Sequence, residues 1–524
     1  MAVTLTGTTG NDTLFGSTAQ ATLINALDGN DRLEGQYTNA TLNGAKGNDS
    51  INIIGGNGGE FVINPGKGDD VIGISGLTSL GTLNIAVEGN NAGDDLFQFG
   101  TALGPVSVGG TINGGDGKDS IVFADGNDFG NAYINLNSGV DQFNISATSA
   151  ATFGVGSVGL GQGNDSATIV STTSVAWNNA TLNGGKGADT FQIDFNTSTE
   201  FSGFEVNLGG GSDVLSAVIG GTGASSGGQI YRGDSGADSL TFTLTAVTTA
   251  GGNYSFSVFG DTEAADSAAF GDIITVDFNI SAVDITGTIA GGGGADTILL
   301  TGSLIETGDI KLSVDGGFGA DVIKVDGNQF IGTINGGGGN DSLVIDQGID
   351  SGRDTNSGAG ANTLIGGAGT DTFANTSLGT SVTLVTAFEV VELEVAIADM
   401  GTADIIKLEG QKVVNADANI ASLSTFYTGA FSSYTGFASG GTAANNIALY
   451  RDGDDIILEI GAGTGLMSTV SDGQTGSSVG MGVIRFVDNS TFAKKVQDAS
   501  GQITALNGSF SFTQGLSGAT VEFN

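Results

Sequence analysis

The sequence predicts an all-β fold, a right-handed parallel β-solenoid with coils of about 24 residues, followed by a C-terminal β domain. Three observations support this prediction. A Gly-Asp turn motif recurs through residues 1–375, its copies are spaced almost evenly, and short apolar stretches of β type flank each copy. Repeats of this length are typical of solenoids, because each repeat buries its apolar face only against its neighbours.

The turn motif reads Gly-Gly, a spacer, Gly, a spacer, Asp, a spacer and an apolar residue. Glycine adopts backbone angles that other residues avoid, so this spacing predicts a tight turn between two strands. Looser copies, such as Gly44–Ile51 and Gly233–Leu240, relax only the second glycine. The clear copies are Gly114–Ile121, Gly184–Phe191, Gly291–Ile298, Gly316–Ile323, Gly336–Leu343 and Gly366–Phe373.

The aspartates of the motif give the repeat period. Asp165, Asp189, Asp213 and Asp238 follow one another at a nearly constant interval of about 24 residues. Near the N-terminus the interval shortens to about 20 residues. We therefore expect each copy of the motif to mark one coil of the solenoid.

The residues around each turn predict two strands per coil. Ala180–Asn183 precedes one turn and Thr190–Phe195 follows it. Apolar residues alternate in the second stretch at Phe191, Ile193 and Phe195, which indicates a strand with one buried face. Stacked coils would then form two parallel sheets that face each other over an Ile, Val, Leu and Phe core, with longer variable loops at the other edge.

The composition excludes several classes of protein. Glycine accounts for 93 of 524 residues and proline for only two, which argues against collagen and against a proline-rich linker. Cysteine is absent, so disulfides and thiolate metal sites are ruled out. Histidine is also absent, which removes His-dependent catalytic triads and zinc sites with His ligands.

The net charge and the distribution of apolar residues exclude some partners and locations. The formal net charge is −41, so nucleic acid and anionic membrane surfaces are not expected as partners. No run of about 18 apolar residues is present, and we expect no membrane insertion. So many carboxylates indicate either a solvated acidic surface or a bound array of cations.

The placement of the aspartates favours cations. Calcium prefers six to eight oxygen ligands at about 2.3–2.6 Å. A glycine turn offers several carbonyl oxygens and one carboxylate, and the matching turn of the next coil supplies more. The aspartates would form a column of like charges along one edge, which is unfavourable unless a divalent ion lies between coils.

The motif resembles the G-G-x-G-x-D-x-U-x repeat of the RTX family of calcium-binding β-helix proteins, over about residues 1–375. The resemblance implies calcium ligation by the motif aspartates. Those that match the motif aspartate are Asp49, Asp119, Asp189, Asp296, Asp321, Asp341 and Asp371. The weaker copies contribute Asp12, Asp31, Asp70, Asp95, Asp165, Asp213, Asp238 and Asp272.

This chain departs from the family pattern in its period. The family's module repeats every nine residues and gives calcium turns on both edges, whereas here the motif returns at more than twice that interval. We therefore expect calcium on one edge only. One copy, Ser138–Asp141, keeps the aspartate but lacks the double glycine.

Residues 376–524 lack the motif and predict a separate β domain or a cap for the solenoid. Ile447–Tyr450 and Ile456–Ile460 read as a hairpin joined by Arg451–Asp455, and a helical piece is possible near Thr491–Ala499. Residues Met1–Thr6 lack a basic region before an apolar stretch, so no cleavable leader is expected. RTX-like proteins are usually exported by type I machinery through an uncleaved C-terminal signal, and the resemblance implies that route.

The function expected from these features is that of a secreted, calcium-binding structural protein, not an enzyme, which self-assembles into an extracellular surface layer. The expected partners are further copies of the chain, joined through residues 1–50, and a cell-surface polysaccharide. An RTX adhesin or biofilm-matrix protein remains an alternative. A secreted carbohydrate-active enzyme also remains open, because a glycosidase needs only two carboxylates.

Overall fold

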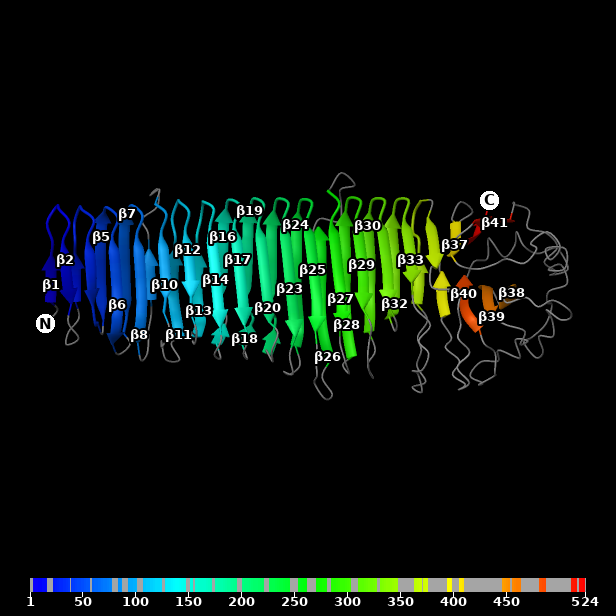
Figure 1. Ribbon diagram of the computed structural model, residues 1–524, viewed down its shortest axis with the longest axis horizontal. Helices are drawn as coiled ribbons and strands as arrows, with labels where there is room; N and C mark the ends of the chain where they lie inside the picture. The colour runs from blue at the N-terminus through cyan, green and yellow to red at the C-terminus, as the bar shows by residue number, and fades with distance from the viewer. Residues whose placement is uncertain are drawn as a thin grey trace. The chain divides into compact units, whose positions relative to one another are not determined.

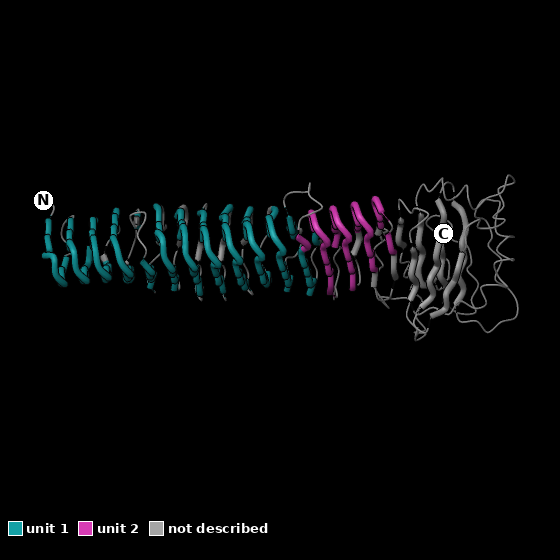
Figure 2. The backbone as a smooth tube through the Cα atoms, turned by 90° about the horizontal axis from the view of Figure 1, so that it is seen from above, with its two compact units in different colours: residues 1–263, 272–286, 305–308 teal, residues 264–271, 287–304, 309–524 magenta. Residues whose placement is uncertain are grey.

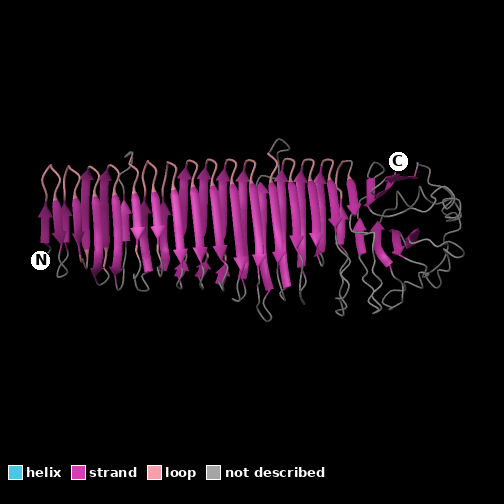
Figure 3. Cartoon of the chain, in the orientation of Figure 1, coloured by secondary structure: helices cyan, strands magenta, loops and turns pink. Residues whose placement is uncertain are grey.

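The computed structural model describes residues 3–375 with gaps (Figure 1). After residue 375 it describes only separate strands. The gaps are 17–21, 38, 57–58, 78–82, 87–92, 101–106, 125–127, 148–150, 154–155, 172–174, 196–199, 221–225, 246–252, 262–269, 280–283, 303–309, 328–329, 347–361 and 370. The later strands are 394–397, 405–409, 445–452, 455–462, 480–486, 510–515 and 518–523. Every described element is a β-strand, and no helix that could cross a membrane occurs among these residues (Figure 3).

Each coil contributes one strand before the Asp turn and one after it. In one coil these are β19 (Thr181–Lys186) and β20 (Thr190–Phe195), and the next coil adds β22 (Glu205–Gly210) and β23 (Val214–Gly220). β19 pairs in parallel with β22, and β20 pairs in parallel with β23. The two pairings have the same offset along the chain, because Thr181 lies opposite Glu205 and Thr190 lies opposite Val214. The predicted parallel β-solenoid is confirmed.

The chain divides into two compact units (Figure 2). Unit 1 comprises residues 1–263, 272–286 and 305–308, and unit 2 comprises residues 264–271, 287–304 and 309–524. Within each unit, the strands that precede the turns form a first sheet and those that follow the turns form a second sheet.

In unit 1 the first sheet contains β1 (Val3–Thr6), β3 (Thr22–Asn25), β5 (Ala40–Lys46), β7 (Phe61–Lys67), β9 (Leu83–Ala86), β11 (Ser107–Asn113), β13 (Asp128–Asn135), β16 (Ser157–Gln162), β19, β22, β24 (Ser226–Ser235) and β26 (Asn253–Asp261). The second sheet contains β2 (Thr13–Gly16), β4 (Arg32–Gly35), β6 (Ser50–Gly56), β8 (Val71–Leu77), β10 (Leu96–Phe99), β12 (Ser120–Phe123), β14 (Gln142–Ala147), β17 (Ser166–Ser171), β20, β23, β25 (Ser239–Thr245) and β27 (Ile273–Asn279). The first sheet also contains three short strands, which pair with one another and with β13 and β24, namely β15 (Ala151–Phe153), β18 (Val175–Asn178) and β21 (Glu200–Ser202).

In unit 2 the first sheet contains β28 (Asp284–Gly293), β30 (Ile310–Phe318), β32 (Phe330–Gly338), β34 (Asn362–Ile365) and β36 (Glu394–Ile397). The second contains β29 (Thr297–Gly302), β31 (Val322–Gly327), β33 (Ser342–Asp346), β35 (Thr372–Asn375) and β37 (Ile405–Glu409). Parallel pairing thus continues beyond residue 375, where the recognisable motif stops.

Antiparallel strands join the last parallel ones. The predicted hairpin is confirmed, because β38 (Asn445–Asp452) pairs antiparallel with β39 (Asp455–Ala462). β40 (Gly480–Phe486) pairs with both β39 and β36. β41 (Phe510–Gly515) and β42 (Gly518–Phe523) form another hairpin, which pairs with β37. The helical piece expected near Thr491–Ala499 lies outside the described residues.

The core lies between the two sheets and repeats with the coils. Phe191, Ile193 and Phe195 of β20 are buried, as their alternation predicts. Aromatic rings stack from coil to coil, with Phe99 and Phe123 centred 4.5 Å apart. Burying one such side chain stabilises the fold by about 1.5–3 kcal/mol. The register that buries these residues also brings every Asp turn to the same edge of its unit.

Candidate cation-binding turns

The turn aspartates form hydrogen-bonded ladders along one edge of each unit. The backbone N–H of Asp165 donates to Oδ1 of Asp189 in the next coil (2.8 Å), and the N–H of Asp189 donates to Oδ1 of Asp213 (2.7 Å). The same bond recurs from Asp12 to Asp272 in unit 1 and from Asp296 to Asp371 in unit 2. In-phase stacking therefore turns a sequence repeat into a continuous row of carboxylates.

All fifteen aspartates predicted from the sequence lie in these two ladders. One member was missed. Asp141 accepts a bond from the N–H of Asp119 and donates its own N–H to Oδ1 of Asp165 (both 2.7 Å). Its motif has decayed, but it precedes Asp165 by the same interval that separates Asp165 from Asp189, which was a usable signal.

A second ladder of hydrogen bonds joins the exposed side of several turns. Its bonds run to the preceding coil, whereas those of the aspartates run to the next coil. The N–H of Asn48 donates to Oδ1 of Asn30 in the preceding coil (3.0 Å), and the N–H of Ala188 donates to Oδ1 of Asn164 (2.9 Å). These residues occupy the spacer before the aspartate. Each such turn therefore has hydrogen bonds to both of its neighbours, which keep the carboxylate row in register.

The second carboxylate oxygen of most ladder aspartates is buried without a hydrogen-bond partner. Such an oxygen costs free energy in a low-dielectric interior unless a proton or a cation compensates it. The aspartates with an unpartnered Oδ2 include Asp31, Asp49, Asp70, Asp119, Asp141, Asp165, Asp189, Asp213, Asp238, Asp321 and Asp341.

Burial raises the pKa of these carboxyl groups above the usual value. Desolvation is the largest cause, and the bond from the neighbouring backbone N–H partly opposes it. The charges of adjacent aspartates raise the pKa further. The pKa of Asp49 rises to about 6, that of Asp189 to about 7 and that of Asp95 to about 8. The edge therefore holds negative charge at a cost that a bound cation would offset.

The second glycine of the motif serves the turn's backbone conformation. Its φ is positive, 108° at Gly185, a region that favours glycine. Four looser copies keep this conformation with other residues, at a cost of about 1–2 kcal/mol for Leu or Ala and less for Asn or Asp. They are Leu27 (77°), Ala45 (86°), Asn137 (69°) and Asp234 (74°).

The first glycine is needed because a side chain at its position would collide with neighbouring oxygen atoms. A Cβ atom added at Gly184 would lie 2.4 Å from Oδ2 of Asp189 and 2.3 Å from the carbonyl oxygen of Leu208 in the next coil. At Gly44 both corresponding distances are 2.2 Å, to Oδ2 of Asp49 and the carbonyl oxygen of Pro65. Oxygens of two successive coils therefore converge under each such turn.

A carboxylate oxygen beside a carbonyl oxygen is the donor chemistry of a hard cation such as calcium. No group of three or more acidic side chains among the described residues could hold a metal ion, so the ligands at a turn would be its ladder carboxylate and backbone carbonyls. These residues fit a calcium ion whose shell is shared between two coils. Bound there, the ion would supply charge compensation and a bridge between coils.

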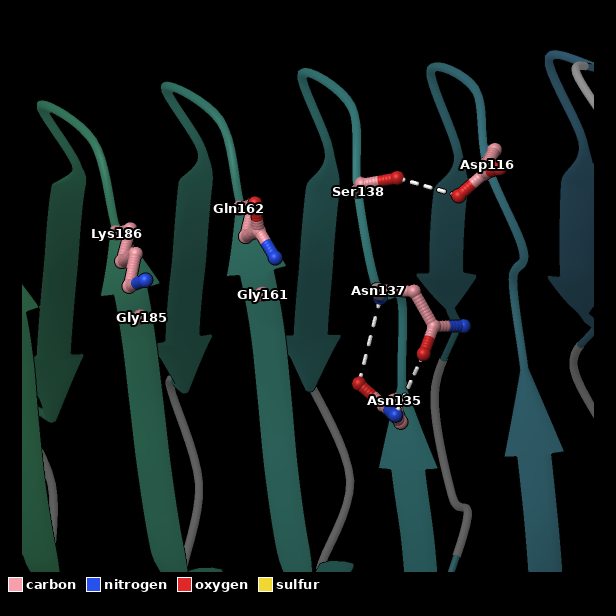
Figure 4. Close-up of a pocket in the computed structure, with 8 residues that line it drawn as sticks. All are labelled: Asp116, Asn135, Asn137, Ser138, Gly161, Gln162, Gly185 and Lys186. Atoms are coloured by element: carbon pink, nitrogen blue, oxygen red, sulfur yellow. Dashed lines mark hydrogen bonds between the residues drawn. The ribbon is translucent and has the colours of Figure 1, made fainter. Parts of the chain in front are cut away.

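A shallow groove of about 540 Å³ lies beside the turns of unit 1 (Figure 4). Its polar groups bond largely to one another, because Ser138 donates to Asp116 (2.5 Å) and Asn135 donates to Asn137 (2.7 Å). It contains one carboxylate, that of Asp116, whereas glycoside hydrolysis needs two. Its lining residues are Asp116, Asn135, Asn137, Ser138, Gly161, Gln162, Gly185 and Lys186.

Neither the protein-family models nor the curated proteins compared with this chain match it. The fold and the turns define it as a parallel β-solenoid with an aspartate ladder along one edge of each unit.

Proposed function

We propose that this protein is a secreted, calcium-binding structural solenoid that self-assembles into an extracellular surface layer. One observation carries the calcium assignment: buried, unpartnered Oδ2 atoms, such as that of Asp189, lie beside carbonyl oxygens of the next coil. Oxygen donors of this kind select calcium over softer metals. The resemblance to RTX repeats supports the same metal.

Calcium also explains how so acidic a chain packs. The formal net charge is −41, and the ladder places carboxylates in adjacent coils. Because the sites exist only when coils are stacked, calcium binding contributes directly to folding free energy. Folding would then await a compartment rich in calcium, which fits export of the chain and a surface location.

The content of the described coils supports a structural role. Most of their acidic side chains at the turns belong to the ladder, and the groove of Figure 4 lacks a pair of carboxylates. An acidic surface opposes self-association unless cations bridge it, so assembly would depend on calcium too. Further copies of the chain and a cell-surface polysaccharide are the partners that we propose.

The test is negative-stain microscopy and light scattering of the whole chain, in millimolar calcium and in chelator. We expect ordered sheets or filaments with calcium and their loss in chelator. A chain that binds calcium but stays monomeric at high concentration would refute the lattice and favour an adhesin. A chain that binds no calcium would refute the proposal altogether.

A further inference from the structure

The first-glycine position, five residues before each ladder aspartate, is not always glycine. Leu136, Leu160 and Leu208 occupy it in three coils of unit 1, and all three are fully buried. Ala26 and Pro65 occupy it in two others and are buried as well. We call these five the filled turns.

The glycine turns share one geometry. The added Cβ would lie 2.2–2.7 Å from Oδ2 of the turn's own aspartate and 2.2–3.1 Å from a carbonyl oxygen of the next coil. Real Cβ atoms do not approach other heavy atoms within 3.0 Å, so these oxygens occupy space that only glycine leaves open. The glycine turns are those of Gly7, Gly44, Gly114, Gly184, Gly233, Gly291, Gly316 and Gly336.

A filled turn has a carbon atom in that space. At Leu208 a Cβ atom and the rest of the apolar side chain stand where the glycine turns bring a carboxylate and a carbonyl oxygen together. The two oxygens of that turn cannot converge in the same way. Carbon lining also gives a cation no ligands, and burying an ion among apolar groups is costly.

Glycine turns and filled turns have a similar backbone conformation. They differ in the side chain at the first-glycine position. Gly209 and Gly211 after Leu208 have φ values of 105° and 153°, against 108° and 129° for Gly185 and Gly187. The ladder bonds are also alike in length, 2.7 Å into Asp213 and 2.8 Å into Asp189.

We propose that each ladder aspartate of a glycine turn binds a calcium ion shared with the next coil, and that filled turns bind none. The inference rests on the proposed calcium binding and narrows it, because a buried Oδ2 without a partner occurs in both kinds of turn and only its convergence with a carbonyl oxygen marks an ion site. The ladder members without an ion are Asp31, Asp70, Asp141, Asp165 and Asp213. Leu208 has two opposite roles. Its carbonyl oxygen faces the site of Asp189 in the preceding coil, while its side chain closes the site of its own turn.

Leu136 and Leu160 fill two successive turns. The coils that contain them are held by buried leucine rather than by an ion. We therefore expect this stretch of unit 1 to respond less to calcium removal than the coil of Gly184.

The test counts calcium ions bound per chain by equilibrium dialysis and native mass spectrometry of the full chain. We expect Leu208→Gly to add one ion and Gly184→Ala to remove one. Gly159→Ala is the matched control, because its Cβ would meet nothing nearer than 3.7 Å, and the count should not change.

Hydrogen exchange of the unaltered protein gives a test that no variant can spoil by misfolding. In chelator, the N–H of Asp165, which bonds to Asp189 of a glycine turn, should lose protection before the N–H of Asp141, which bonds to Asp165 of a filled turn. Equal loss at both, or an unchanged count in folded Leu208→Gly, would overturn the two classes while leaving calcium binding intact. A wild-type chain that binds no calcium would overturn both proposals.

Discussion

At the scale of single residues, the ladder aspartates combine two roles that separate substitutions can distinguish. Oδ1 of Asp189 accepts the backbone N–H of Asp165, and Oδ2 is buried without a partner. The first role is structural and needs only an acceptor. The second needs a compensating charge, so it depends on the cation.

Asp189→Asn keeps an acceptor for the Asp165 N–H and removes the charge. We expect the variant to be at least as stable as the wild type in chelator but less stable in calcium, by roughly 1–3 kcal/mol for one lost charge-assisted contact. Urea unfolding in both conditions measures this. Asp194→Asn, in β20 away from the turn, is the control and should shift both conditions equally. The same shift in both conditions for Asp189→Asn would contradict the metal role.

The raised pKa values predict an unusual dependence of stability on pH. Ladder carboxyls bind protons more tightly in the folded chain than in the unfolded one, where the pKa is 3.8. The unfolded state therefore loses its protons first, and stability falls as pH rises from about 4 towards 8.

In chelator, we expect the midpoint of thermal unfolding to rise as pH is lowered from 8 to 5. In saturating calcium the trend should weaken or reverse, because protons then compete with the ion. Melting curves at fixed ionic strength check both statements. Stability that increases with pH in chelator would show that the buried carboxylates are compensated in some other way.

At the scale of elements, the turns of successive coils share one backbone conformation, although the residues that adopt it differ in how well they tolerate it. The second-glycine position has positive φ with glycine and with other residues alike. The shape is imposed by pairing with both neighbouring coils, as the N–H of Gly187 bonds to the carbonyl of Gly210 (2.8 Å). Looser copies therefore keep the turn at the expense of local strain.

Ala45→Gly should relieve such strain. Ala45 has a φ of 86° and an exposed side chain, so glycine removes a steric penalty without leaving a cavity. We expect a gain of about 0.5–1 kcal/mol in the free energy of unfolding, after the entropy cost of glycine in the unfolded chain. Chemical denaturation measures the gain. Ala188→Gly, exposed in another turn without positive φ, should lose a few tenths to about 1 kcal/mol; a loss in both variants would refute the argument.

At the scale of the whole molecule, the coils interact mainly with their immediate neighbours. β20 pairs with β17 on one side and β23 on the other. Stability in such an architecture is close to a sum of coil terms and nearest-neighbour terms, so damage should remain local.

Phe191→Ala removes a fully buried ring from β20, a change that costs about 3–5 kcal/mol in a packed core. We expect faster hydrogen exchange in β17, β20 and β23, and unchanged exchange in β31 and β33 of unit 2. Exchange read by mass spectrometry on peptides from each strand decides the matter. Uniform acceleration across both units would mean that the chain unfolds as one cooperative body.

Sequence alone determined the local features of this protein. Alternation at Phe191, Ile193 and Phe195 predicts a strand with one buried face, because side chains of a strand point to opposite sides. The even spacing of Asp165, Asp189 and Asp213 predicts equal coils. These features depend on residues close together in the chain. They can be recognised from the sequence because the same period is repeated many times.

Only the tertiary structure decided what the stacked turns do to one another. The ladder bond, the unpartnered Oδ2 of Asp189 and the approach of the Leu208 carbonyl to Gly184 all involve the neighbouring coil. Asp141 belongs to the ladder despite its decayed motif, because pairing with both neighbouring coils places it there. Such contacts join residues a full coil apart in the chain, so their geometry depends on register and packing rather than on any local pattern.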